Sequence, residues 1–260
     1  MPLSSTFDDA LRALAQGRII IVADSEDREN EADFLIAAER VTAESVHFMI
    51  SHGRGQLCMP VSAEIACRLN LKPMVPRKSP GMPCFAVPVD HALCKTGISP
   101  KERAFTIRKM VDESSRPEDF CRPGHIFPLL ARAGGLRERQ GHTEATIDLM
   151  RLAGLAPAGV LCEICSRDGE HMATGEELID LAKTLNVPMI TIADVIRALQ
   201  ATSPDANGDA GAPPTNRLIG TLAPGARGRR VPSCAASGPH RRNGKHQPLP
   251  PSSTDGTSLR

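Results

Sequence analysis

Ile19-Ile-Ile-Val22, a short β-branched run, is followed by the polar stretch Asp24-Ser-Glu-Asp-Arg-Glu-Asn-Glu-Ala-Asp33 and by a second apolar run, Phe34-Leu-Ile-Ala-Ala38. The first run is typical of a buried strand. A polar stretch directly after a strand is a loop, and loops carry binding and catalytic residues on a rigid scaffold. Because apolar sequence flanks this loop on both sides, some of its acids are expected near the core.

Outward from this stretch, helices and strands intermix without a strict βα repeat. The helices are predicted by start and stop residues, and they are expected at 6–17, 43–51, 62 onward, 99 onward, 142–152, 174–185 and 194–200. Further strands are expected at 56–59, 85–89, 126–130, 159–164 and 188–192. This mixture predicts an α/β (α+β) fold with layers of helices on a mixed sheet.

The chain has two compositional regimes, which predict its domain organisation. Residues 1–200 contain the helix and strand patterns, and we expect them to form a single domain. Residues 201–260 are rich in Ser, Pro, Gly, Thr and Arg, with 8 Lys+Arg against 3 Asp+Glu. This segment has too little apolar content to offset the entropy of ordering, so it is predicted to be a disordered, low-complexity basic tail. Its dilute charge favours a solvated appendage over a nucleic-acid-binding segment.

Composition also limits the class of protein. Aromatic residues make up 3% of the chain, with no Trp and no Tyr, and the formal net charge is +1. Stacking platforms and a basic surface are therefore missing, and we expect no nucleic-acid partner. No apolar run approaches the ~20 residues that span a bilayer, and residues 1–17 lack the layout of a signal peptide. A cytoplasmic enzyme with no membrane partner is the expected class.

The polar stretch 24–33 contains six acids and one Arg. Mg²⁺ prefers oxygen ligands and keeps several waters, so one or two of these carboxylates would suffice to hold it. The alternative is a solvated acidic loop without a ligand.

Three further positions have candidate chemistry. His125, in Arg122-Pro-Gly-His125, is a candidate for proton transfer because histidine side chains exchange protons near neutral pH, although a structural role is the alternative. Arg139-Gln-Gly-His-Thr-Glu144 precedes a predicted helix, whose free N–H groups favour a phosphate, with Arg139 and Thr143 as additional donors. Glu163 lies in an apolar strand, where a carboxylate suits proton transfer or a structural ion pair.

Cys162 and Cys165 have the spacing of zinc ligands. No second pair accompanies them, and they lie within an apolar run. A zinc site is therefore the weaker interpretation of these two residues.

Four motifs together resemble the 3,4-dihydroxy-2-butanone 4-phosphate synthase family over residues 5–200. They are Glu26-Asp-Arg-Glu-Asn-Glu-Ala-Asp33, Arg122-Pro-Gly-His-Ile-Phe-Pro128, Gly141-His-Thr-Glu-Ala145 and Gly159-Val-Leu-Cys-Glu163. The resemblance implies conversion of D-ribulose 5-phosphate to L-3,4-dihydroxybutan-2-one 4-phosphate and formate in riboflavin biosynthesis. It also implies a three-layer sandwich on a twisted sheet, Mg²⁺ (or Mn²⁺) as cofactor, and a homodimer with active sites at the interface.

The resemblance assigns roles to particular residues of this chain. Glu29 and His142 would be the metal ligands, and His125 and Glu163 would transfer protons. Substrate would contact Arg28, Glu29, Asp33, Arg139, Gln140, Gly141, His142, Thr143 and Glu163, while Cys58 would make a contact at most. Many members continue into a GTP cyclohydrolase II domain with a cysteine-bound zinc, and we expect that activity to be absent here.

The chain departs from the family pattern at Gln140, where Gly is usual, and at Pro83 and Lys95, where Thr is usual. If the backbone needs a positive φ at Gln140, the side chain would hinder phosphate binding. Two alternatives to the synthase therefore stay open. One is a divergent paralogue that acts on another sugar phosphate. The other is a non-catalytic protein that binds a sugar phosphate or a partner enzyme.

Overall fold

The computed structural model describes residues 6–25, 27–76, 79 and 81–202, and the elements below belong to these residues. The predicted tail lies outside them from residue 203 onward. In chain order the elements are α1 (Phe7–Ala15), β1 (Ile20–Ala23), β2 (Ala32–Ala37), η1 (Ala38–Arg40), α2 (Ala43–His52), β3 (Arg54–Val61), α3 (Ala63–Arg68), β4 (Val89–His91), α4 (Pro100–Val111), η2 (Pro117–Asp119), β5 (Phe120–Leu130), η3 (Gly135–Arg137), α5 (His142–Leu152), β6 (Gly159–Ile164), α6 (Gly175–Leu185), β7 (Met189–Thr191) and α7 (Ile192–Ala201).

Seven strands of the described residues form one sheet in the order β4-β5-β3-β6-β2-β1-β7. The pairs β1–β7 and β3–β5 are parallel, and the other neighbours are antiparallel. The predicted mixed sheet is therefore confirmed. In its centre, β2 and β6 pair so that Asp33 lies opposite Glu163, two residues that were predicted to belong to one site.

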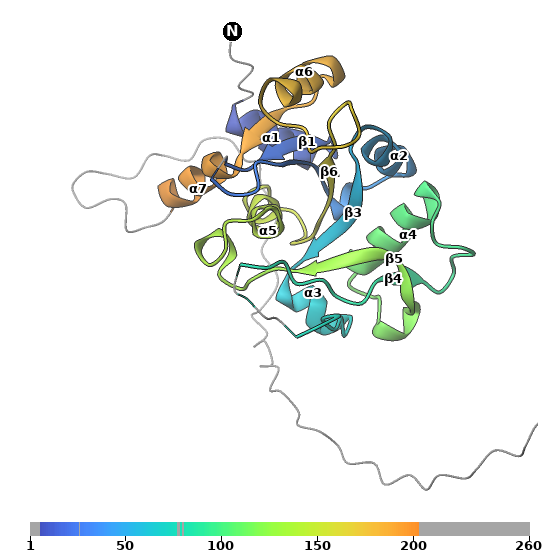
Figure 1. Cartoon of the computed structure of the whole chain (residues 1–260). Coiled ribbons are helices and arrows are strands. Elements are labelled where there is room, and N and C mark those ends of the chain that lie inside the picture. The colour runs from blue at the N-terminus through green and yellow to red at the C-terminus, as the bar shows by residue number, and fades with distance from the viewer. Residues whose placement is uncertain (1–5, 26, 77–78, 80, 203–260) are drawn as a thin grey trace, which may run out of the picture. The chain divides into compact units, whose positions relative to one another are not determined.

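Helices cover both faces of this sheet, which confirms the three-layer arrangement (Figure 1). One core cluster joins the sheet to α2, α3, α4 and α6, and a second joins it to α1, α5 and α7. The sheet residues of the second cluster belong to β1, β2 and β7, and α5 also lies against β3 and β6. Beside it, over β3, β5 and β6, lies a small cluster in which Cys58, Leu129 and Leu161 are packed by Phe85 and Phe127. Among the described residues, no helix contributes a side chain to this small cluster.

Side-chain capping explains several helix starts. Thr6, Thr42 and Thr191 each accept a hydrogen bond from the backbone three residues on, and each forms a capping box. Helix α4 begins as predicted, with Ser99 as its cap and Pro100 in the first turn.

Two local predictions are wrong. The helix predicted from Thr174 exists, but Thr174 makes no capping hydrogen bond. Glu177, which stands where the second member of a capping box would be, instead accepts the Arg167 N–H at 2.6 Å. The strand predicted at 85–89 is displaced, since β4 begins at Val89 and Phe85 forms only an isolated bridge. Pro88 has no N–H to donate, so a continuous ladder could not pass through it.

Within the described residues, no helix has the length and apolar composition needed to cross a bilayer.

The core between β2 and α2 depends on Phe34, whose side chain is fully buried and meets the ring of Phe48 edge-to-face with centroids 5.5 Å apart. We predict that Phe34→Ala lowers the free energy of unfolding by about 3–5 kcal/mol, through lost transfer energy and the cavity left behind. Urea denaturation followed by circular dichroism measures this change. Val75→Ala, at a loop side chain that is 64% exposed, is the control, and it should change the stability by less than about 0.5 kcal/mol. Equal effects of the two substitutions would contradict the prediction.

Candidate functional site

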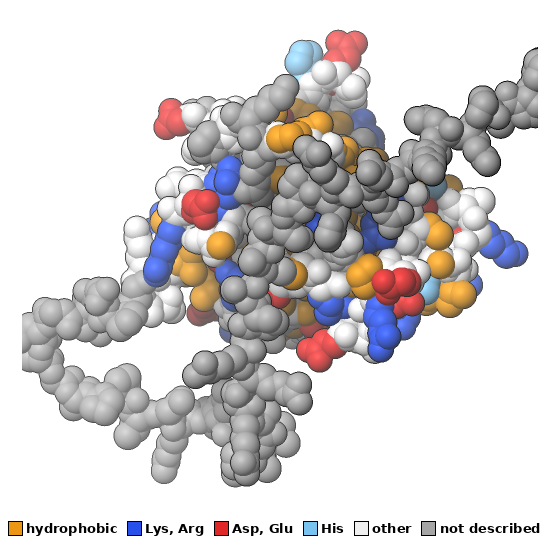
Figure 2. Space-filling view, turned by 90° about the horizontal axis from the view of Figure 1, so that it is seen from below, with side chains coloured by type: hydrophobic (Ala, Val, Ile, Leu, Met, Phe, Trp, Pro, Cys, Tyr) orange, Lys and Arg blue, Asp and Glu red, His pale blue; other side chains and the backbone are white. Residues whose placement is uncertain are grey.

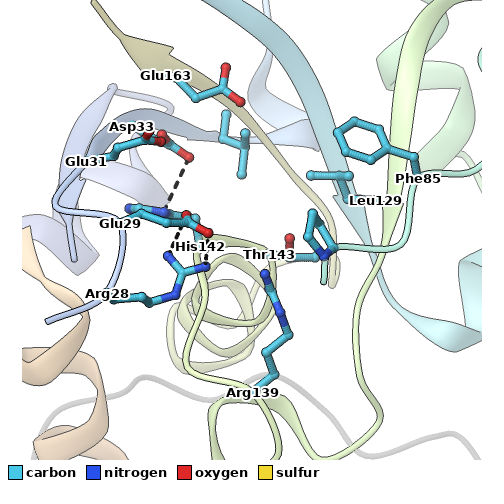
Figure 3. Close-up of a pocket in the computed structure, with 12 residues that line it drawn as sticks. Arg28, Glu29, Glu31, Asp33, Phe85, Leu129, Arg139, His142, Thr143 and Glu163 are labelled. Carbon is cyan, nitrogen blue, oxygen red and sulfur yellow. Dashed lines mark hydrogen bonds and ion pairs between the residues drawn. The ribbon is translucent and has the colours of Figure 1, made fainter. Parts of the chain in front are cut away.

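A cavity of about 80 Å³ opens between the first turn of α5 and the small cluster of Cys58, Leu129 and Leu161 (Figure 3). It brings together seven of the residues that the sequence predicted for the site: Arg28, Glu29, Asp33, Arg139, His142, Thr143 and Glu163. Glu31, Pro83, Phe85, Leu129 and Leu161 complete its lining. The predicted site residues His125, Gln140 and Gly141 are not among the lining residues. Segments far apart in the sequence thus meet in one hollow.

The loop between β1 and β2 positions the first group of charges. Asp24 follows β1 directly, and its side chain is 1% exposed. Its Oδ1 accepts the Glu31 N–H at 2.9 Å, and its Oδ2 forms an ion pair with Arg28. Arg28 Nη1 lies 2.8 Å from Glu29 Oε2, and Nη2 donates to Glu29 Oε1 at 2.9 Å. Arg28 therefore contacts two carboxylates of the same loop.

A group of potential metal ligands lies beside this loop. Asp24, Glu29 and His142 each offer a ligand atom, and these atoms lie within 4.8 Å of one another. Glu29 and His142 were predicted as ligands from the family resemblance, whereas Asp24 was missed. The signal that could have found Asp24 is its place as the first acid after a buried strand, where the chain leaves the core.

His142 is oriented by a backbone contact that suits a metal ligand. It is the first residue of α5, and its Nε2 lies 3.0 Å from the Val22 carbonyl oxygen. A carbonyl only accepts, so Nε2 carries the proton and Nδ1 keeps its lone pair. Burial lowers the pKa of His142 below its ordinary value, which favours the neutral imidazole that metals bind.

Two acids face each other across the central strands. Asp33 on β2 is buried, and its Oδ1 has no hydrogen-bond partner among the described residues. Burial, followed by the negative charge of Glu163, raises the pKa of Asp33 well above its usual value. Glu163 on β6 accepts the Gln56 N–H at 2.8 Å. Figure 3 shows both side chains on the wall of the cavity above His142.

The acidic wall also affects Glu31, which is half-buried at the end of the loop. Burial, followed by the charges of Glu29 and Glu163, raises the pKa of Glu31. Carboxylates that lie this close repel one another, and a bound cation would relieve the repulsion.

The opposite side of the cavity is basic. Arg139 Nη1 forms an ion pair with buried Glu144 at 2.6 Å, and its Nε donates to the Gly81 carbonyl at 2.8 Å. Thr143 is buried in the first turn of α5. A Cβ at Gly141 would come within 2.3 Å of Arg139 Nη1, so Gly141 gives the guanidinium its room. An arginine, a hydroxyl and a helix N-terminus thus meet here, which suits a phosphate.

Gln140 and Lys95 lie away from this cavity. The non-glycine residues with positive φ are Asn30, Arg54, Asn70 and Asn186 among those described, so the backbone at Gln140 does not need a glycine. Gln140 lines a neighbouring hollow of about 550 Å³ with Ser25 and Thr191. Lys95 lines a different hollow beside α4. Of the three departures from the family pattern, only Pro83 lies in the wall of the cavity.

His125 is held on β5 by Asp90 of β4. Its Nδ1 lies 2.6 Å from Asp90 Oδ2, and its backbone N–H donates to Asp90 Oδ1 at 2.9 Å. The side chain of His125 is 41% exposed, so the ring presents its other nitrogen outward. Asp90 was missed by the sequence analysis, since nothing near it in the sequence points to His125.

The zinc interpretation of Cys162 and Cys165 gains no support. Cys162 packs in the core between β6 and α2, and its Sγ donates to the Gly55 carbonyl at 3.5 Å. Burial raises the pKa of Cys162 to about 12, whereas zinc binds the thiolate. Cys58, next to the cavity wall at Leu161, also has a raised pKa because it is buried.

We predict that Cys121, which is exposed, reacts with iodoacetamide first among the free cysteines of the described residues. Cys162 should react at least about a hundredfold more slowly at mildly alkaline pH, because the thiolate is the nucleophile. Mass spectrometry of tryptic peptides over time measures both rates. In denaturant the two rates should become similar. Rapid labelling of Cys162 in the folded protein would show that β6 opens readily.

Comparison with known proteins identifies the family. The 3,4-dihydroxy-2-butanone 4-phosphate synthase family model matches residues 8–198. The riboflavin biosynthesis protein RibBA of Bacillus subtilis (strain 168) is 51% identical over 191 residues, which are 73% of this chain and 48% of that protein. The chain thus spans about half the length of the curated relatives it matches.

Solved structures that resemble this chain belong to the same family. RibBX from A. baumannii, described as a two-domain 3,4-dihydroxy-2-butanone 4-phosphate synthase, has a TM-score of 0.74 and 42% identity, over 77% of this chain and 59% of that one. A 3,4-dihydroxy-2-butanone 4-phosphate synthase in complex with two magnesium ions has a TM-score of 0.72 and 37% identity, over 76% of this chain and 98% of that one.

Proposed function

The chain belongs to the 3,4-dihydroxy-2-butanone 4-phosphate synthase family, and we propose that it converts D-ribulose 5-phosphate to L-3,4-dihydroxybutan-2-one 4-phosphate and formate in riboflavin biosynthesis. The observation that carries the proposal is the cavity itself. It has potential metal ligands on one side and a phosphate-binding arrangement on the other.

The ligand group fits a divalent cation. Two carboxylates and a neutral imidazole are donors that Mg²⁺ or Mn²⁺ accepts, with waters in the remaining positions. Asp24, Glu29 and His142 would hold the ion. When bound, it would polarise the ketose carbonyl and stabilise the negative charge that develops on the sugar oxygens.

The remaining residues bind the substrate and move protons. Arg139 and Thr143 would hold the phosphate, together with the free N–H groups at the start of α5. Asp33, whose raised pKa favours the protonated form, can donate a hydrogen bond to a sugar oxygen. Glu163 lines the cavity opposite Asp33. It would therefore be within reach of the bound sugar and would accept a proton from it.

His125 is the second group proposed for proton transfer, yet it does not line the cavity of its own chain. We therefore propose a homodimer in which His125 of one protomer completes the cavity of the other. Asp90 would fix the imidazole through Nδ1 and leave Nε2 for the substrate. The small cluster of Cys58, Leu129 and Leu161, to which no helix of the described residues contributes, gives this proposal a place for the partner. We further propose that the protein acts in the cytoplasm without a nucleic-acid or membrane partner.

The test is the release of formate from D-ribulose 5-phosphate by the purified protein, with Mg²⁺ and with EDTA. Formate that depends on the metal supports the proposal. If a folded, metal-loaded sample releases none, the proposed reaction is wrong. Screening other pentulose and tetrulose phosphates would then separate the paralogue from the non-catalytic binding protein, with Pro83 as the first residue to replace.

A further inference from the structure

We propose that the guanidinium of Arg28 and the divalent cation compete for the same pair of carboxylates, Asp24 and Glu29, so that binding of the cation releases Arg28 toward the anionic substrate. The proposal rests on the function proposed above, because it assumes that Asp24, Glu29 and His142 bind a cation. It gives Asp24 a positioning role, as an anchor for Arg28 in one arrangement and for the cation in the other.

The contacts of the two carboxylates carry the argument. Each of their four oxygens has a nitrogen partner. Asp24 Oδ1 accepts the Glu31 N–H at 2.9 Å, and Asp24 Oδ2 pairs with Arg28. Both oxygens of Glu29 contact Arg28, at 2.8 Å to Nη1 and 2.9 Å to Nη2. Arg28 therefore holds three of the four oxygens, in the fork geometry that guanidinium groups form with carboxylates.

One oxygen of each carboxylate belongs to the ligand group with His142. A guanidinium is charged at every pH of interest. A doubly charged cation placed between Asp24 and Glu29 would lie within a few ångströms of that charge, and the two would repel each other strongly in a partly buried site. Mg²⁺ also requires nearly regular octahedral geometry. The charge of the cation therefore opposes the contacts of Arg28 with these carboxylates and favours an arrangement in which the guanidinium has moved away.

A displaced Arg28 has a use in the same cavity. Its side chain is 24% exposed and lines the hollow with Arg139 and Thr143 (Figure 3). Freed from the carboxylates, the guanidinium can bind a phosphate or an anionic oxygen of the sugar. Binding of the cation then strengthens binding of the anion. Because coupling between two sites is reciprocal, the anion strengthens binding of the cation by the same factor.

The competition predicts an unusual result for a substrate-binding arginine. The affinity for Mn²⁺ is measured without substrate, from the electron paramagnetic resonance signal of the free ion. We expect Arg28→Met to bind Mn²⁺ about tenfold more tightly than the wild type, within the usual range of coupling between sites. Arg28→Lys keeps the charge but loses the fork, so it should bind with intermediate affinity. The matched control is Arg197→Met, which removes a positive charge from an exposed side chain on α7 and should change the affinity by less than about twofold.

Inorganic phosphate tests the release step. Phosphate should tighten Mn²⁺ binding in the wild type, and this gain should be smaller in Arg28→Met, where no guanidinium is released. An equal gain in both proteins would overturn the release step.

Arg28→Met that binds Mn²⁺ no more tightly than the wild type would overturn the competition itself. If Arg28→Met does not fold by circular dichroism, the same criterion applies to Arg28→Lys. A folded wild-type protein that binds no Mn²⁺ would instead remove the metal site and the proposed function with it, so the two failures are distinguishable.

Discussion

The Glu29→Gln variant is expected to release formate from D-ribulose 5-phosphate on the order of 10²- to 10³-fold more slowly than the wild type at saturating Mg²⁺, the loss typical when charge stabilisation is removed from a transition state. Glu29 is the more exposed carboxylate of the ligand group, with 49% of its side chain accessible, and it lines the cavity. Gln keeps the shape of the side chain but lacks the charge that holds a divalent cation.

Two measurements separate this effect from a loss of folding. Mn²⁺ affinity should fall together with the rate, while the thermal unfolding midpoint of the metal-free protein should change little. Glu113→Gln removes the same charge at an exposed position after α4 and should keep the wild-type rate. A wild-type rate in Glu29→Gln would move the metal site to other residues.

Mixing two inactive variants, His125→Ala and Glu163→Gln, is expected to restore part of the activity. His125→Ala and Glu163→Gln should each be inactive as homodimers. The mixed dimer should contain one intact cavity, with Glu163 from one protomer and His125 from the other. Random exchange makes half of the dimers mixed, so the recovered formate release should reach roughly a quarter of the wild-type rate. The physical basis is that Glu163 lines the cavity of its chain and His125 does not.

The control is a mixture of His125→Ala with Glu29→Ala. Glu29 belongs to the same cavity as Glu163, so this pair should also recover activity. Glu163→Gln mixed with Glu29→Ala should stay inactive, because each protomer then has a damaged cavity of its own. Recovery in this last mixture, or none in the first two after confirmed subunit exchange, would contradict a site shared between protomers.

The sequence predicted most of the fold because its signals are local. Strand Ile20–Ala23 follows from a β-branched run, and helix Pro100–Val111 follows from a serine cap and a proline. The strand at 85–89 was displaced, since a proline and a register shift at Val89 divide the ladder. The start of this strand depends on its pairing with β5, and that pairing cannot be inferred from residues 85–89 alone.

The site was predictable in part for the same reason. The motifs identify residues of suitable chemistry, and seven of them line one cavity. The missed contributions come from contacts across long separations. Asp90 holds His125 from another strand, and the Val22 carbonyl orients His142. Whether His125 acts in the partner's cavity depends on an assembly that the single chain does not contain.

The pairing of β2 with β6 has a consequence for how this protein can evolve. Side chains alternate along a strand, so Asp33 and Glu163 face the cavity while their neighbours Phe34 and Cys162 pack into the opposite core. Mutations at the cavity positions can therefore alter what the protein acts on while the core that stabilises it is inherited unchanged. Changes at Asp33 and Glu163 therefore leave the core on the opposite face of the sheet intact.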